Sequence, residues 1–120
     1  MALIGLISHD AAAAASLETA LREAGHSVRL MDLQMADGAS LEAPDLFVVD
    51  MDGEKGALDN VRRLCEGLPT ALTPVLVAGS PEMAGALAGA CAYGASGYLR
   101  KPFSTVETVP DTERALTAPL

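Results

Sequence analysis

Three short, nearly uninterrupted apolar runs constrain the fold of this chain more than any other feature. They cover residues 2–7, 46–49 and 75–78. A strand with apolar residues at consecutive positions is buried on both faces, as strands are in a parallel sheet covered by helices on both sides. Residues 27–31 alternate polar and apolar side chains and are predicted to form an edge strand, and residues 97–100 a short fifth strand.

Segments with helical features separate these strands. Asp10 can cap a helix over residues 11–24, and Gly25 can close it in a left-handed conformation. Further helices are predicted over residues 57–66 and 82–93. Strands that alternate with helices imply right-handed crossovers. We therefore predict an α/β fold with a doubly wound, five-stranded parallel sheet, formed by residues 1–120 as a single domain.

Charge and composition exclude several classes of function. The formal net charge is -8, and no stripe of Lys and Arg offsets it, so we expect no nucleic-acid binding. The first apolar run is too short for a signal peptide or a membrane span, so we expect no membrane contact and a cytoplasmic location. Cys65 and Cys91 are predicted to be buried thiols rather than a disulfide.

The residues that follow the predicted strands are the candidates for a functional site. In parallel α/β sheets, sites form beyond the carboxyl ends of the strands, where the strand order reverses. The polar and small residues at these positions are Ser8, His9, Asp10, Asp50, Asp52, Gly79, Ser80 and Lys101.

Three stretches, in register along nearly the whole chain, resemble the CheY-like receiver domain of bacterial response regulators. They are residues 44–50 (Pro-Asp-Leu-Phe-Val-Val-Asp), residues 74–77 (Pro-Val-Leu-Val) and residues 93–103, which end in Arg-Lys-Pro-Phe. The resemblance implies the flavodoxin-like strand order 2-1-3-4-5. It also implies a role in two-component signalling.

The resemblance also assigns positions to the family's phosphorylation site. Asp50 stands where the phosphoacceptor aspartate should, and Lys101 where the conserved lysine of the family should. The acidic pair that holds a divalent metal in the family is replaced by Ser8 and His9, and the hydroxyl residue after the fourth strand by Gly79. The site is therefore predicted to be degenerate, without a bound metal and with an inactive Asp50.

Some neighbouring residues offer partial replacements. Asp10 and Asp52 could supply a displaced metal site, and Ser80 a hydroxyl group. Tyr98 matches the family's switch aromatic, which we expect to be fixed in one position because no hydroxyl group stands at residue 79. The interaction of Asp50 with Lys101 is interpreted as a structural ion pair, with a residual active site as the alternative.

Two further departures from the family concern helices. Residues 38–44 leave room for about one helical turn, so the family's second helix is predicted to be shortened or missing. Pro110 is predicted to interrupt the last helix, which would end near Val109 or form two pieces over residues 104–109 and 111–116.

The leading hypothesis is a non-enzymatic signalling module, a pseudo-receiver that binds a protein partner or its own copy independently of phosphorylation. The alternative is a phosphorylatable receiver that uses Asp50 with a rearranged site for Mg²⁺, the only case in which a cofactor is expected. A flavodoxin-like ligand-binding domain ranks last, because residues 8–12 contain no glycine for a phosphate loop.

The protein contact is predicted on the face formed by residues 82–93, 97–100 and 104–109, the family's usual output face. Gly89 and Arg100 are the interface candidates, since small residues permit close approach and arginine is enriched at interface hot spots. The alternative location is the surface near residues 33–41, which a shortened second helix would uncover.

Overall fold

The computed structural model describes residues 2–8, 10–30, 44–51, 57–66, 73–80, 85, 89, 94–101, 103 and 105–117. Within them, a single parallel sheet has the strand order β2-β1-β3-β4-β5. The strands are β1 (Leu3–Ile7), β2 (Ser27–Leu30), β3 (Leu46–Asp50), β4 (Val75–Gly79) and β5 (Gly97–Arg100). The predicted fold class and strand order are confirmed.

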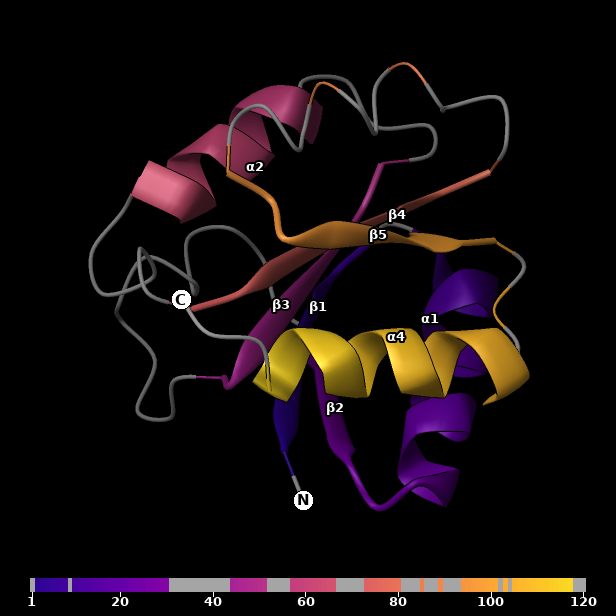
Figure 1. The fold of residues 1–120 in the computed structure, drawn as a ribbon. Coiled ribbons are helices and arrows are strands. Elements are labelled where there is room, and N and C mark those ends of the chain that lie inside the picture. The colour runs from indigo at the N-terminus through magenta and orange to yellow at the C-terminus, as the bar shows by residue number, and fades with distance from the viewer. Residues whose placement is uncertain are drawn as a thin grey trace.

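Helices cover both faces of this sheet, as Figure 1 shows. α1 (Ala11–Glu23) and α4 (Thr105–Thr117) pack on one face, and α2 (Ala57–Glu66) packs on the other. The predicted shortening near residues 38–44 lies outside the described residues. So does most of the predicted helix 82–93, of which Gly85 and Gly89 are described and are helical. No helix in the described part of the chain is long and apolar enough to cross a bilayer.

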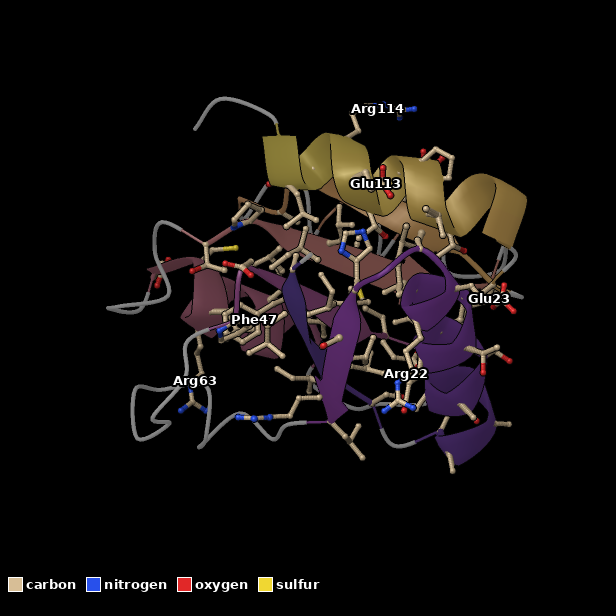
Figure 2. All side chains as sticks on the ribbon, turned by 90° about the horizontal axis from the view of Figure 1, so that it is seen from below. Arg22, Glu23, Phe47, Arg63, Glu113 and Arg114 are labelled. Atoms are coloured by element: carbon tan, nitrogen blue, oxygen red, sulfur yellow. The ribbon has the colours of Figure 1, made fainter. Side chains whose placement is uncertain are left out.

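Strand β3 shows why the consecutive apolar residues fold this way. Leu46 and Val48 pack with residues of α1 and α4, whereas Phe47 and Val49 pack with Val61 and Leu64 of α2. Figure 2 shows Phe47 on the α2 side of the sheet. Because successive side chains of a strand point to opposite faces, every residue of a central strand is buried here.

Helix α1 has the ends that its sequence predicts. The Asp10 carboxylate accepts hydrogen bonds from the backbone N–H groups of Ala12 and Ala13, which satisfies donors that have no partner within the helix. The helix ends before Gly25, whose φ of 93° is a left-handed conformation that glycine adopts without steric cost. The chain therefore turns sharply into β2.

Helix α4 corrects one sequence-based expectation. The predicted interruption at Pro110 is wrong, because α4 runs from Thr105 to Thr117 with Pro110 inside it. The proline faces solvent, while Val109, Ala115 and Leu116 pack against the sheet. Proline has no N–H group, so one hydrogen bond of the helix is missing at residue 110. The apolar packing on both sides of this residue stabilises the helix despite that loss.

A histidine ties α4 to the start of the chain. The backbone N–H of Ala2 donates to Nδ1 of His26 at 3.2 Å, and Nε2 of His26 lies 3.4 Å from Oε1 of Glu113. Because Nδ1 accepts, the proton of a neutral ring is on Nε2 and points to the Glu113 carboxylate. Figure 2 shows Arg114 pointing outward from α4, with Glu113 nearer to the sheet. His26 thus joins three segments that are distant in sequence.

Candidate functional site

The candidate site lies at the carboxyl end of the sheet, as the strand pattern predicts. Ser8 follows β1, Asp50 is the last residue of β3, Gly79 is the last residue of β4, and Lys101 follows β5. Asp50 continues the row of Leu46 and Val48, so its side chain projects on the face that α1 and α4 cover. The sheet therefore brings residues from positions 8, 50 and 101 of the chain to one place.

The carboxylate of Asp50 is the centre of this site. Its side chain is 2% exposed, and Nζ of Lys101 lies 3.1 Å from Oδ1 and 3.0 Å from Oδ2. Oδ2 also accepts a hydrogen bond of 2.8 Å from the Ser8 hydroxyl group. A buried carboxylate is costly unless it is paired and hydrogen-bonded, and here it is both.

The backbone places Lys101 for this contact. The amide of Lys101 donates to the carbonyl oxygen of Gly79 at 3.1 Å, which continues the pairing of β5 with β4 beyond the end of β5. Lys101 lies next to β4, the strand that pairs with β3, and the lysine stem is long enough to reach the end of β3. The Lys101 side chain is 12% exposed, so solvent screens the ion pair weakly.

Asp10 connects the site to helix α1. Its Oδ1 atom caps the helix, and its Oδ2 atom lies 3.5 Å from Nζ of Lys101. The backbone N–H of Ala13, helped by the charge of Lys101, holds the pKa of Asp10 below its usual value, against the opposing effect of desolvation. Because the folded-state pKa is the lower one, the stability that Asp10 contributes is present above the unfolded pKa. It is lost as the pH falls through the folded value.

The described residues of the site do not fit a divalent metal ion. Mg²⁺ needs several oxygen ligands, but Asp50 already binds an ammonium group through both oxygens, and one oxygen of Asp10 caps α1. No group of three or more His, Cys, Asp or Glu residues in the described part of the chain could hold a metal ion. The predicted contributors His9 and Asp52 lie outside the described residues.

The other predicted residues take different places. Gly79 is buried at the end of β4, and Ser80, directly after it, is half-buried. Tyr98 lies on β5, with 47% of its surface exposed. Gly89 is helical and half-buried, and the backbone of Arg100 ends β5.

The sequence identified the positions of the site but did not predict the hydrogen bonds that Ser8 makes there. Ser8 was predicted only as a residue that replaces a metal ligand, whereas its hydroxyl group donates to Asp50 and its oxygen accepts from the backbone N–H of Asp10 at 3.1 Å. The two-residue spacing of Ser8 and Asp10 is a signal for the bond to the Asp10 backbone, since serine can bond the backbone two residues on, but it gives no signal for the bond to Asp50. The His26–Glu113 contact had no such local signal, because 87 positions separate its partners.

Comparisons with known proteins agree with this geometry at the level of the fold. No family model and no curated protein matches the sequence. Among solved structures, one from Chloroflexus aurantiacus, described as a candidate response regulator, is similar with 25% identity and a TM-score of 0.81, over 98% of each chain. The receiver domain of NtrX from Brucella abortus is 23% identical with a TM-score of 0.83, over 96% of this chain and 99% of that one.

A response regulator from Thermotoga maritima gives a TM-score of 0.82 at 21% identity, over 97% of this chain and 98% of that one. The strand order and these likenesses define a flavodoxin-like α/β protein. More narrowly, the fold is that of a CheY-like receiver domain. The structure from Chloroflexus aurantiacus, which is 25% identical, supports a signal-transduction module.

Proposed function

We propose that this chain is an atypical receiver, a protein-interaction module of signal transduction that acts without phosphorylation of Asp50. In this proposal it is not an enzyme and needs no cofactor. Its cytoplasmic location stays an expectation from the sequence. The observation that carries the proposal is the engagement of Asp50 by Lys101 and Ser8 in a buried position.

This engagement works against phosphoryl transfer in two ways. To accept a phosphoryl group, a carboxylate oxygen must attack phosphorus while a cation neutralises the incoming oxygens. Both oxygens of Asp50 already bind the Lys101 ammonium group, which lowers their nucleophilicity. Ser8 donates a hydrogen bond to the same carboxylate. A metal site would need an additional oxygen ligand at this position instead of a donor.

A phosphodonor experiment tests this proposal. When the full chain is incubated with MgCl₂ and acetyl phosphate, we expect its intact mass to stay unchanged, while a working receiver treated in parallel gains a phosphate. The Asp50→Asn variant shows whether any adduct forms at Asp50. A phosphate adduct on the wild-type chain that is absent from Asp50→Asn would establish the alternative, a phosphorylatable receiver.

We place the protein contact of this module on the face of residues 82–93, 97–100 and 104–109, with Gly89 and Arg100 as candidates and a second copy of the chain as partner. Tyr98 supports this location, because it is a large side chain on β5 with 47% of its surface exposed. Tyrosine is enriched among interface hot spots, where its ring buries a large area. Leu30, on the opposite edge strand β2, is 61% exposed and provides a matched comparison.

Sedimentation analysis distinguishes the two edges of the sheet. We expect the wild-type chain to dimerise with concentration, and Tyr98→Ser to weaken the dimer by at least tenfold in dissociation constant, since a hot-spot residue contributes about 2 kcal/mol. Leu30→Ser should leave the dimer unchanged. The opposite result would favour the alternative contact near residues 33–41, which follow β2 in the sequence, and a chain that stays monomeric would exclude the homodimer.

A further inference from the structure

Ser8 is a neutral hydrogen-bond donor beside the Asp50 carboxylate, at a position where a charged side chain would change which cation this carboxylate binds. Its hydroxyl group donates to Oδ2 of Asp50 at 2.8 Å, and the same Oδ2 atom lies 3.0 Å from Nζ of Lys101. The ammonium group of Lys101 also lies 3.5 Å from Oδ2 of Asp10. Of the described part of the chain, the carboxylates of Asp50 and Asp10 and the ammonium group of Lys101 thus meet at the carboxyl end of the sheet. Ser8 adds a hydrogen bond to this group but no charge.

We propose that Ser8 makes the Asp50 carboxylate select the Lys101 ammonium group over a divalent cation. This inference rests on the proposed function and names the residue that determines the ligand of the same site. The protein's own ammonium group serves as the resident cation. The chain therefore carries the charge compensation that an external ion would otherwise supply.

The selectivity follows from what a hydroxyl group and a carboxylate each do beside Asp50. The Ser8 hydroxyl uses its proton on Asp50 and accepts from the amide of Asp10, so its hydrogen-bonding capacity is directed within the protein. A carboxylate at position 8 has no proton to donate and would repel Asp50 across a hydrogen-bonding distance. Among the described residues, it would add a third carboxylate to those of Asp50 and Asp10 near Lys101.

One ammonium group cannot neutralise three clustered carboxylates, whereas a divalent cation can bind them together. Carboxylate oxygens are the ligands that Mg²⁺ and Mn²⁺ prefer, and affinity rises with the number of charged ligands. The Coulomb interaction between such groups is strong at a site as buried as Asp50. A single added charge at position 8 is therefore sufficient to change the preferred cation.

The test compares two substitutions of nearly equal size, Ser8→Asp and Ser8→Asn, in the full chain. Calorimetric titration with MnCl₂ and MgCl₂ at constant ionic strength measures the affinity for the cation, and circular dichroism measures the melting temperature with and without it. We expect Ser8→Asp to bind at least tenfold more tightly than Ser8→Asn. We also expect its melting temperature to rise with metal concentration, because a ligand that binds the native state stabilises it. The wild-type chain and Ser8→Asn should show neither effect.

Each outcome decides between the two proposals. If Ser8→Asp binds no better than Ser8→Asn while the wild-type chain does not bind, the role of Ser8 is refuted and the proposed function stands. Tight binding by the wild-type chain would overturn both. If Ser8→Asp is unfolded in the absence of metal, refolding on addition of MnCl₂ supports the proposal, and failure to refold at any concentration counts against it. Adding Asp50→Asn to Ser8→Asp should abolish the binding, and binding that persists would place the metal elsewhere.

Discussion

Replacing Lys101 with methionine is expected to lower the free energy of unfolding by about 3–5 kcal/mol, a large share of the stability of a small domain. The substitution keeps a long stem but removes the ammonium group that lies 3.0 and 3.1 Å from the two oxygens of Asp50. The Asp50 side chain, at 2% exposure, would then lose its ammonium partner. Urea unfolding followed by circular dichroism measures the loss.

Two controls make this prediction specific. Arg22→Met removes the partner of Glu18 from a pair with side-chain exposures of 67% and 39%, and we expect it to change stability by at most about 0.5 kcal/mol. The double variant Asp50→Leu/Lys101→Met should recover most of the loss, since apolar replacement of a whole buried ion pair is often neutral. A change below about 1 kcal/mol in Lys101→Met would contradict the pairing that the proposed function requires.

The Pro110→Ala substitution is expected to raise the free energy of unfolding by about 2–3 kcal/mol. Pro110 lies inside α4, where it cannot donate a hydrogen bond to the carbonyl group of Val106 and its ring crowds that carbonyl group. Its side chain is exposed, so alanine removes no packing from the core. Thermal and urea unfolding of the variant measure the gain.

Pro74→Ala is the matched control for this prediction. Pro74 precedes β4 outside any helix, and its carbonyl oxygen accepts from the amide of Phe47 at 2.9 Å, a contact that alanine retains. We expect a loss of about 0.4–1 kcal/mol, because the unfolded chain gains freedom without the ring. If Pro110→Ala destabilised the protein instead, the prediction would be wrong. An interaction of the proline itself, and not the missing hydrogen bond, would then determine the stability of α4 around residue 110.

The sequence predicts the sheet and most of the site because both depend on local patterns. Consecutive apolar residues in β3 and β4 require burial on two faces, and that requirement sets the parallel sheet and the helices around it. A parallel sheet then brings the residues after its strands to one edge, and the resemblance to receiver domains assigns Asp50 and Lys101 to one site at this edge. The cap at Asp10 was predictable for the same local reason.

What the sequence could not predict depends on contacts between distant segments. The continuity of α4 across Pro110 is decided by the packing of Val109, Ala115 and Leu116 on the sheet, whereas the local rule for proline predicts a break. The hydrogen bond from Ser8 to Asp50 joins residues 42 positions apart. A motif assigns such a position by analogy and gives no indication of which atom donates the bond.

The place of α4 in the chain has a consequence for synthesis. Ala115 belongs to the same core cluster as Ile4, Leu6 and Leu99, on the sheet face that α1 and α4 share. The five strands precede α4 in the sequence, as the colours from indigo to yellow show in Figure 1. The strands therefore leave the ribosome before α4 can cover its part of this face. A nascent chain that pauses before residue 105 therefore leaves part of this apolar face uncovered, and a chaperone can bind the exposed surface.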